Sequence, residues 1–395
     1  MFFKRKILEK AAMILVPLMM MTAIPSAVLA SDDTQAVIED EEINLNLECK
    51  SAVLMEATTG EVLYAQNADE ALPPASVTKV MTLLLVMEAI EEGKLSLDSN
   101  VTTSAHAASM GGSQIFLKEG ETMSVEDMLK SVVIASANDA ACALAEAVSG
   151  SEAAFVKRMN ERASELGMKN TSFENTNGLD DTAQNHVTSA RDIAIMSREL
   201  IKHKKILEYS STWMDTVRNG LFGLTNTNRL VRFYRGCTGL KTGSTSKAGF
   251  CVSATAERDG VSLICVIMGA ETGDKRNSIA ASLLDWGFAN YGVYSYTPEA
   301  LEPMHVKGGT SSLVNVEAQG FKCVIEKGNM GKVTYKTELR EAVSAPISKG
   351  DTVGQMIFYC DGNEIGKADI VASQGVPKID FFVLWYRMMA KFLLK

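Results

Sequence analysis

The segment Pro74-Ala75-Ser76-Val77-Thr78-Lys79, with the apolar run from Val80 to Met87 directly behind it, decides the fold of this chain. Pro73 and Pro74 end an extended approach, because proline fixes φ and disfavours helix in the residue before it. The residues after Ser76 favour helix as far as Gly93, so we predict a helix of about four turns that opens at Ser76. Lys79 would then lie on the same helical face as Ser76, one turn away.

A serine at this position lies where unpaired backbone N–H groups and the positive end of the helix dipole converge. A hydroxyl beside an amine at the start of a buried helix is typical of an activated nucleophile and its base. N-capping is the alternative role for Ser76. Ser-x-x-Lys is a short pattern, and a second copy is present at Ser244-Thr245-Ser246-Lys247. Other motifs in the chain therefore have to decide whether Ser76 is a nucleophile or an N-cap.

Two further motifs follow along the chain. Ser136-Ala137-Asn138, the only Ser-x-Asn in the sequence, lies in a predicted turn between two helices. Lys241-Thr242-Gly243 also occurs once and comes just before a predicted strand, where glycine lets a ligand approach the backbone closely. The order Ser-x-x-Lys, Ser-x-Asn, Lys-Thr-Gly, with gaps of about 60 and 100 residues, is far more specific than any one of the three motifs.

Around these motifs, the sequence predicts an α+β domain with strands at both ends and a helical middle. The predicted strands are residues 52–55, 61–64, 249–256 and 261–268, and the predicted helices are residues 125–134, 140–148, 155–166, 190–201 and 279–291. Short alternating strands with glycine turns follow from about residue 298 and predict a small all-β module without chemistry of its own. The 395 residues are enough for two domains and a large core.

The N-terminus predicts export. A basic region, Lys4 to Lys10, precedes an apolar stretch from Ala11 to Val28 and a small-residue cleavage site that ends at Ala30. An uncleaved membrane anchor is the alternative. Removal of residues 1–30 would change the formal net charge from −9 to −12, which argues against nucleic acid as a partner. We divide the chain into five parts: signal peptide 1–30, acidic linker 31–46, α+β domain 47–297, small β domain 298–372 and terminal helix 373–395.

The C-terminal sequence KIDFFVLWYRMMAKFLLK, residues 378–395, predicts a helix that lies on a membrane surface. At helical spacing its charges fall on one narrow stripe, and aromatic and aliphatic side chains cover most of the rest. The segment is short and charged for a bilayer span, but it suits the membrane interface. A helix docked on its own protein is the alternative. With export, this predicts a protein on the extracytoplasmic face of the bacterial membrane.

The cysteines do not indicate a metal. Seven are present, scattered and odd in number, and no Cys-x-x-Cys or Cys/His cluster has metal-ligand spacing. Most are expected to be buried small apolar residues. Cys237 and Cys251 flank a predicted hairpin, so a disulfide between them is an open alternative. With four histidines in the chain, a zinc site has little to build on, and we expect neither metal nor cofactor.

At the three motifs the chain resembles the penicillin-recognising serine enzymes, and more closely the low-molecular-mass penicillin-binding proteins that are D-alanyl-D-alanine carboxypeptidases. The resemblance extends over nearly the whole chain and includes the segments NTNGLDD, residues 175–181, TSARDIA, residues 188–194, and GLKTGSTSKAGF, residues 239–250. It implies a β-lactamase/transpeptidase-like fold, in which an antiparallel sheet is combined with a helical subdomain. It also implies hydrolysis of peptidoglycan stem peptides and inhibition by β-lactams.

The resemblance implies a role for each motif residue. Ser76 would attack the carbonyl of the penultimate D-Ala and form an acyl-enzyme, with neutral Lys79 as base and Ser136 as relay to the leaving amine. Asn138 would hold the Lys79 ammonium or a substrate amide. The substrate-binding residues would be Asn138, Lys241, Thr242, Gly243, Ser244 and Arg276.

Among these, Lys241 and Thr242 would bind the terminal carboxylate, and the N–H groups of Ser76 and Ser244 would form the oxyanion hole. The side chain of Ser244 departs from the aromatic or histidine often found at that position of the family, which leaves its backbone donor intact. Arg276 would lie near the carboxylate site, with a surface salt bridge as the alternative. We interpret the lone His186 as structural.

Two other functions compete with hydrolysis of stem peptides. A class A-like β-lactamase would have Asp in place of Ala137, and an acidic deacylation residue with Asn four positions on, which neither Glu165 nor Glu174 provides. A membrane-tethered, non-hydrolytic sensor of penicillin or muropeptides would not need all three motifs intact. Endopeptidase activity would use the same residues as carboxypeptidase activity. The sequence therefore favours a serine-type D-Ala-D-Ala carboxypeptidase.

Overall fold

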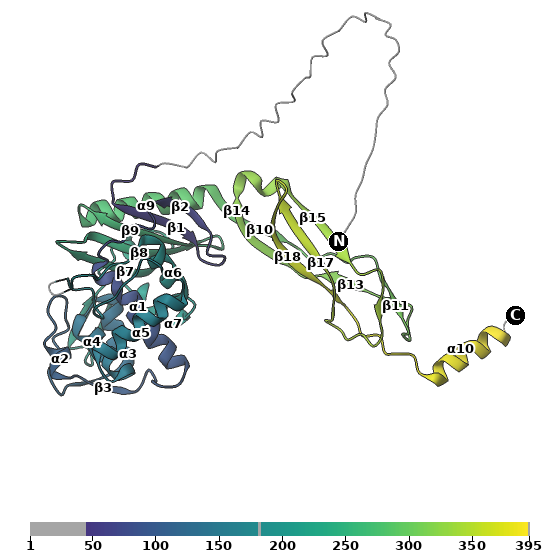
Figure 1. Cartoon of the computed structure of the whole chain (residues 1–395), viewed down its shortest axis with the longest axis horizontal. Coiled ribbons are helices and arrows are strands. Elements are labelled where there is room, and N and C mark those ends of the chain that lie inside the picture. The colour runs from purple at the N-terminus through teal and green to yellow at the C-terminus, as the bar shows by residue number, and fades with distance from the viewer. Residues whose placement is uncertain (1–44, 181–182, 394–395) are drawn as a thin grey trace, which may run out of the picture. The chain divides into compact units, whose positions relative to one another are not determined.

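The computed structural model of the chain describes residues 45–180 and 183–393 (Figure 1). The predicted signal peptide and almost all of the predicted acidic linker lie outside the described residues. The described part has an α+β domain with an antiparallel sheet and a helical subdomain, followed by a module of strands and a terminal helix. The predicted fold class is confirmed.

A five-stranded antiparallel sheet joins the two ends of the α+β domain. Its strand order is β2-β1-β9-β8-β7, and the strands are β1 Ser51–Glu56, β2 Val62–Gln66, β7 Cys237–Thr245, β8 Gly249–Arg258 and β9 Val261–Ala270. The first hairpin pairs Leu54 with Tyr64, and β1 then pairs with β9, so that Val53 lies opposite Val266. The predicted strands 52–55 and 61–64 thus pair as β1 with β2, and the predicted strands 249–256 and 261–268 pair as β8 with β9.

The two faces of the sheet pack against different layers, because successive side chains of a strand point to opposite faces. Val53 and Val266 belong to the core shared with the helical subdomain. Leu54 and Cys265 belong to a second core that includes Leu283 of helix α9, Gly273–Asn290. The ribbon shows α9 along one side of the sheet and the other helices on the opposite side (Figure 1).

The helical subdomain surrounds helix α1. Its helices are α1 Lys79–Glu91, α2 Ala105–Ala108, α3 Val125–Ile134, α4 Asn138–Ser149, α5 Glu152–Glu165, α6 Ala190–Leu200, α7 Lys204–Ser210 and α8 Leu230–Phe233. Short strands β3 Asn100–Thr102, β4 Thr122–Ser124, β5 Met214–Val217 and β6 Phe222–Thr225 form two hairpins. Helix α1 is apolar on all sides and is buried over nearly its whole length, as expected for a central helix.

The predicted start of the first long helix is wrong. Residues Ala75–Thr78 form a 3₁₀ turn, and α1 begins only at Lys79. Ser76 therefore lies in the turn, and neither Pro74 nor Thr78 at the helix starts makes a side-chain cap. N-capping is excluded as the role of Ser76, since its hydroxyl is bonded to the Lys79 side chain instead.

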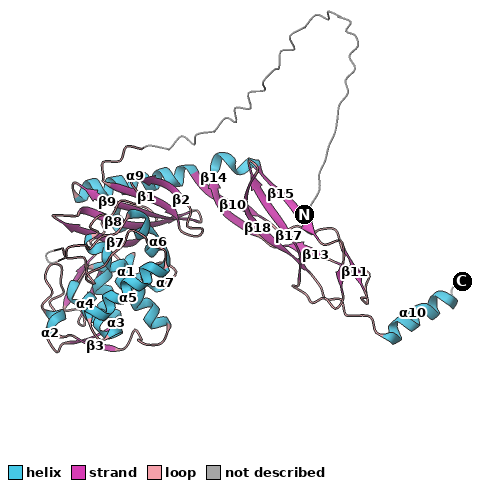
Figure 2. Ribbon diagram, viewed as in Figure 1, coloured by secondary structure: helices cyan, strands magenta, loops and turns pink. Residues whose placement is uncertain are grey.

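The second part of the chain consists almost entirely of strands (Figure 2). These are β10 Tyr291–Tyr296, β11 Met304–Lys307, β12 Leu313–Val314, β13 Val316–Ala318, β14 Phe321–Glu326, β15 Val333–Leu339, β16 Val343–Ser344, β17 Thr352–Cys360 and β18 Asn363–Ala372, with one 3₁₀ segment, Lys327–Lys332. A separate core includes Phe358, whose ring stacks on that of Phe321 at a centroid distance of 4.2 Å.

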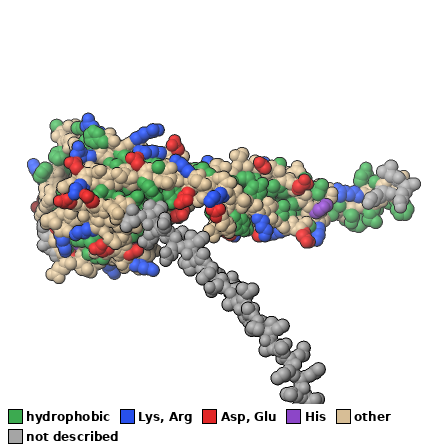
Figure 3. Space-filling view, turned by 90° about the horizontal axis from the view of Figure 1, so that it is seen from above, with side chains coloured by type: hydrophobic (Ala, Val, Ile, Leu, Met, Phe, Trp, Pro, Cys, Tyr) green, Lys and Arg blue, Asp and Glu red, His purple; other side chains and the backbone are tan. Residues whose placement is uncertain are grey.

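The chain ends in helix α10, Phe381–Leu393, over which hydrophobic side chains gather (Figure 3). Phe382, Trp385 and Phe392 are all more than half exposed. A search of the described residues found no helix that is both long and apolar enough to span a membrane.

The open disulfide alternative is excluded, because all seven cysteines are free. Cys237 lies opposite Ala256 in the β7–β8 ladder, whereas Cys251 lies opposite Gly243. The two thiols are therefore offset by several residues along neighbouring strands and cannot form the predicted bridge.

Candidate active site

The 3₁₀ turn presents Ser76 beside Lys79. The Nζ of Lys79 and the Oγ of Ser76 lie 2.8 Å apart. Ser76 is half-buried, whereas Lys79 is completely buried. A second bond, from Lys79 Nζ to the carbonyl oxygen of Asn177 at 2.8 Å, fixes the direction of the amine. The lysine is thus held rigidly against the serine hydroxyl, although the two residues come from a turn and a helix rather than from one helix.

The surroundings of Lys79 favour its neutral form. Burial holds its pKa well below the usual range of lysine, and the nearby ammonium of Lys241 lowers it further. The carboxylate of Asp139 acts in the opposite direction but does not reverse the shift. A neutral amine has a free electron pair, so Lys79 can accept the proton of the Ser76 hydroxyl.

A tight turn at residues 175–179 packs against the nucleophile segment. Gly178 has φ +85°, and a Cβ there would lie only 1.8 Å from the carbonyl oxygen of Ala75. Asn175 closes the turn, because its Oδ1 accepts from Gly178 N at 2.7 Å and its Nδ2 donates to Leu179 O at 2.7 Å. This position therefore requires glycine, both for the backbone conformation and for the close approach.

His186 supports the same nucleophile segment, Ala75 to Thr78, through hydrogen bonds. Its Nδ1 accepts from Glu174 N at 3.0 Å, which leaves the proton on Nε2, and Nε2 lies 2.7 Å from Thr78 Oγ1. The hydroxyl of Thr78 in turn donates to Ala75 O at 2.8 Å. Burial lowers the pKa of His186 to about 4. The structure thus gives this histidine a neutral, supporting position behind the nucleophile turn, as the sequence analysis expected.

The Ser-x-Asn motif, Ser136 to Asn138, forms the second part of the site. Ser136 has φ +62° and lies in the turn between α3 and α4, and it is buried. Asn138 donates through its backbone N to Ser113 O and through Nδ2 to Gly111 O, each at 2.7 Å. Its buried Oδ1 has no hydrogen-bond partner in the described part of the chain. An unpaired acceptor oxygen suits either of the two partners expected for Asn138, the Lys79 ammonium or a substrate amide N–H.

Strand β7 carries the third part of the site, the Lys-Thr-Gly motif. Lys241 is buried, and its Nζ donates to Thr242 O at 2.9 Å. Burial lowers the pKa of Lys241 to about 7, with a further contribution from the guanidinium of Arg276. Thr242 donates its hydroxyl to Thr227 Oγ1 at 2.8 Å. The motif residues lie within β7, which comes directly before β8, the strand predicted at residues 249–256.

Gly243 brings this strand against the nucleophile. A Cβ at Gly243 would lie 2.7 Å from Ser76 N and 2.9 Å from Pro74 O. The backbone of Ser244, the next residue, is therefore close to that of Ser76, while the Ser244 side chain is exposed. Arg276 is buried, donates to Cys251 O and to Asn277 Oδ1, and forms no ion pair within residues 45–180 and 183–393. The alternative of a surface salt bridge is wrong for Arg276.

Three supporting residues were not identified from the sequence. Asn177 orients Lys79 through a main-chain carbonyl, and Thr227 holds the Thr242 hydroxyl. The carboxylate of Asp139 accepts from Leu117 N at 2.9 Å and so fixes the loop before α3. The Asn-Thr-Asn-Gly sequence signals a tight turn around Asn177, but no sequence pattern indicates Thr227.

The comparisons with known proteins agree with this geometry. Residues 35–272 match the family model of D-alanyl-D-alanine carboxypeptidase, and residues 300–378 match that of the C-terminal domain of penicillin-binding protein 5. The D-alanyl-D-alanine carboxypeptidase DacF of Bacillus subtilis is 41% identical over 383 residues, which cover 95% of this chain and 96% of that protein.

Solved structures agree as well. Penicillin-binding protein 5 of Haemophilus influenzae superposes with a TM-score of 0.70 at 32% identity, over 84% of this chain and 98% of that one. Penicillin-binding protein D2 of Listeria monocytogenes, in its ampicillin-bound form, superposes with a TM-score of 0.57 at 36% identity, over 62% of this chain and 99% of that one. The chain therefore belongs to the D-alanyl-D-alanine carboxypeptidase family, the serine-type hydrolases among the penicillin-binding proteins.

Proposed function

We propose that this carboxypeptidase removes the terminal D-Ala from peptidoglycan stem peptides through an acyl-enzyme on Ser76. The observation that carries the proposal is the 2.8 Å contact between Ser76 Oγ and Lys79 Nζ, in which the lysine is completely buried and its pKa is well below the usual range. A buried neutral amine in contact with a serine hydroxyl is the arrangement that activates a nucleophile without histidine.

In the first half-reaction, Lys79 takes the proton of Ser76, and Oγ attacks the carbonyl carbon of the penultimate D-Ala. The charge that develops on the carbonyl oxygen is stabilised by the N–H groups of Ser76 and Ser244, each worth a few kcal/mol, about 3 kcal/mol in comparable enzymes. The proton then passes through Ser136 to the leaving nitrogen, the C–N bond breaks, and D-Ala departs. The stem peptide remains as an ester on Ser76.

In the second half-reaction, water attacks the same carbonyl and gives its proton to Lys79. The C–O bond of the ester breaks, and the proton returns to Ser76 Oγ, so that the free enzyme is restored. A β-lactam would acylate Ser76 in the same way, and its ring-opened product would leave slowly.

The Lys-Thr-Gly and Ser-x-Asn motifs bind the substrate. The cation of Lys241, with Arg276 behind it and the hydroxyl of Thr242 beside it, suits the terminal carboxylate of D-Ala-D-Ala. Gly243 allows the substrate backbone to run along β7 without a side chain in the way. The unpaired Oδ1 of Asn138 suits an amide N–H of the stem peptide. A sensor that binds without acylation would not need a neutral lysine at the serine.

Release of D-alanine from a diacetyl-Lys-D-Ala-D-Ala peptide tests the proposal. We expect the full chain to release D-alanine and the Ser76→Ala variant to lose at least about a thousandfold in rate, since removal of a nucleophile leaves only the binding and oxyanion contributions. Ser246→Ala, at an exposed serine within the second Ser-x-x-Lys copy, is the matched control. Penicillin labelling of Ser76 without any D-alanine release would favour a sensor. Absence of both labelling and release would rule out the site.

We also propose that the chain divides into a peptidase domain 47–297, a β domain 298–372 and a membrane-binding helix 373–395, after a signal peptide 1–30 and an acidic linker 31–46. The two family matches lie on either side of the boundary at residue 297. The exposed apolar side chains of α10 support attachment at the extracytoplasmic membrane surface, because an interfacial helix needs such a face.

Membrane attachment is tested with the exported protein after its mature N-terminus has been determined. The double variant Phe382→Glu and Trp385→Glu should release it from washed membranes. Leu221→Glu, at a position that is 88% exposed on the peptidase domain, is the control and should leave the protein bound. Retention of the double variant on the membrane would exclude α10 as the anchor.

A further inference from the structure

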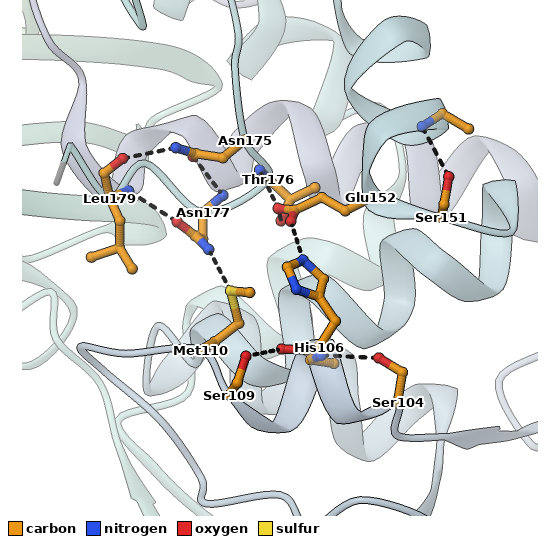
Figure 4. Close-up of polar contacts among 12 residues, drawn as sticks. Ser104, His106, Ser109, Met110, Ser151, Glu152, Asn175, Thr176, Asn177 and Leu179 are labelled. Atoms are coloured by element: carbon orange, nitrogen blue, oxygen red, sulfur yellow. Dashed lines mark hydrogen bonds and ion pairs between the residues drawn. The ribbon is translucent and has the colours of Figure 1, made fainter. Parts of the chain in front are cut away.

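Three potential metal ligands from three helices meet outside the catalytic residues. They are His106 of α2, Cys142 of α4 and Glu152, the first residue of α5. Their ligating atoms all lie within 4.8 Å of one another, and His106 Nε2 is 2.7 Å from Glu152 Oε2. The close-up shows the imidazole of His106 and the carboxylate of Glu152 pointing toward each other (Figure 4).

We propose that His106, Cys142 and Glu152 form a zinc site. Imidazole nitrogen, thiolate sulfur and carboxylate oxygen together suit zinc, whereas calcium and magnesium prefer oxygen ligands alone. Zinc–ligand distances of about 2.0–2.3 Å place tetrahedral ligand atoms roughly 3.3–3.6 Å apart. The 2.7 Å His106–Glu152 contact would thus open by about 0.6 Å, and the thiol, which lies within 4.8 Å of the other two ligand atoms, would close in by up to about 1.2 Å. Rotation of the side chains can supply shifts of this size.

Charge and burial fit this assignment. Cys142 is completely buried and Glu152 mostly so, while the side chain of His106 is about half exposed and leaves a route for the ion. A thiolate and a carboxylate together carry the two negative charges that neutralise Zn²⁺, so the bound site has no net charge to desolvate.

A cysteine binds zinc as the thiolate, so the thiol of Cys142 has to lose its proton when the metal binds. Zinc would form the S–Zn bond as the S–H bond breaks, with release of one proton to solvent. Binding should therefore tighten as the pH rises.

The surroundings of Glu152 complete the site. Its other oxygen, Oε1, accepts from Thr176 N at 3.1 Å and from Thr176 Oγ1 at 2.7 Å. These two bonds orient the carboxylate and leave Oε2 for the metal, as outer-shell partners do in zinc proteins. A cavity of about 420 Å³, lined in part by His106, Met110 and Glu152, gives room for a water as fourth ligand.

The site is also connected to the catalytic lysine. Thr176 O accepts from Thr82 Oγ1 of α1 at 2.6 Å, and the carbonyl of the next residue, Asn177, holds Lys79 Nζ. Zinc at Glu152 would thus anchor the turn that orients the general base, without taking part in the reaction. The inference does not depend on the roles proposed for the catalytic residues.

The experiment uses the full chain in detergent, stripped with a chelator and then titrated with Zn²⁺ or Co²⁺. We expect one zinc per chain, release of about one proton per zinc, and an absorption band of thiolate-to-cobalt charge transfer. Cys142→Ser should remove that band, and His106→Ala should weaken zinc binding at least about tenfold. The matched controls, Cys360→Ser and His305→Ala in the β domain, should change neither.

Serine at the buried position 142 can disturb the packing. His106→Ala therefore provides an independent test, because His106 lies on the exposed side of the site. Penicillin labelling of each variant shows that its peptidase domain is folded. Absence of the cobalt band in the unaltered chain, or equal zinc affinity in the unaltered chain and His106→Ala, would overturn the proposal. His106 and Glu152 would then form an ion pair only.

Discussion

The two copies of Ser-x-x-Lys in this chain have the same side chains at the same spacing and entirely different surroundings. In the first copy, a 3₁₀ turn runs into a helix, so Ser76 and Lys79 lie on one side and touch at 2.8 Å. In the second copy, Ser244 lies near the end of β7 and Lys247 in the turn that follows, and both side chains are exposed.

The comparison teaches that the motif matters only together with its surroundings. Lys79 is buried beside a second lysine, and both effects lower its pKa. Lys247, in contrast, is exposed to solvent. The chemistry of the first copy therefore comes from the burial that the turn and its neighbours impose, and not from the pair of residue types.

Replacement of each lysine by arginine should separate the two copies most clearly. Guanidinium keeps the charge but cannot lose its proton near neutral pH. Lys79→Arg should therefore lower the acylation rate by roughly 10²- to 10⁴-fold, the usual contribution of a general base. Lys247→Arg should change the rate less than about twofold, since surface substitutions have small effects. Stopped-flow measurement of β-lactam acylation gives both rates, and equal rates for the two variants would exclude Lys79 as the base.

The turn that holds the first copy can be tested with two glycines. Gly178 has φ +85° and Gly120 has φ +79°, so alanine strains the backbone similarly at both positions. An added Cβ meets Ala75 O at 1.8 Å in the first case and has nothing within 4 Å in the second.

Gly120→Ala should thus cost only the strain, about 1–2 kcal/mol of stability. Gly178→Ala should also displace Ser76 and lower the acylation rate at least about tenfold. The melting temperature and the acylation rate, measured on both variants, separate the two effects. If Gly178→Ala acylates as fast as Gly120→Ala, the 175–179 turn does not position the nucleophile.

The parts of the fold that follow from local pattern were predictable. Helix α3 has both predicted ends, because an apolar period and flanking polar residues define it. Helix α6 begins at its predicted first residue, Ala190, where Ser189 Oγ accepts from Asp192 N at 3.1 Å. The start of α1 was not predictable, since the 3₁₀ turn depends on close contacts with Gly178 and Gly243, which are distant in sequence.

The site was predictable to the extent that its motifs are contiguous. The residue types of Ser76, Lys79 and Lys241 indicate the chemistry, but the burial of both lysines depends on the pairing of β7 with β8 and on α1 packing. The proposed zinc ligands show the opposite case. His106 and Cys142 are far apart in the sequence and have no metal-ligand spacing, so only the packing of α2 against α4 and α5 brings them together.

His186, behind the first copy, should make stability depend on pH. Its pKa is about 4 in the folded chain and about 6.5 in an unfolded one. Because the folded pKa is depressed, this contribution to stability is complete above pH 6.5 and is lost as the pH falls toward 4. The loss should reach about 3 kcal/mol.

The His186→Gln variant should flatten this part of the pH dependence, as measured by denaturant unfolding between pH 4 and 7. His305→Gln, at an exposed position in the β domain, is the control and should leave the dependence unchanged. A pH dependence that persists in His186→Gln would have to come from the carboxylates.

The pH profile of acylation should report the protonation of the two buried lysines. The change in rate that it should show is the smallest of the effects expected here. Lys79 must be neutral to accept a proton, so kcat/KM rises with pH through its lowered pKa. Lys241 must stay cationic to bind the carboxylate, so kcat/KM falls as the pH rises through its pKa of about 7. At pH 8 the fall should be about tenfold.

Lys241→Arg should remove this falling limb, whatever its effect on the maximum rate, because guanidinium remains charged throughout. Lys247→Arg, in the exposed copy, should leave the profile as it is. The shape of the profile is the decisive readout, since a merely structural role of Lys241 would lower the rate equally at every pH. A falling limb that remains at the same pH in Lys241→Arg would assign it to another group, and the pair of buried lysines would no longer explain the difference between the two copies.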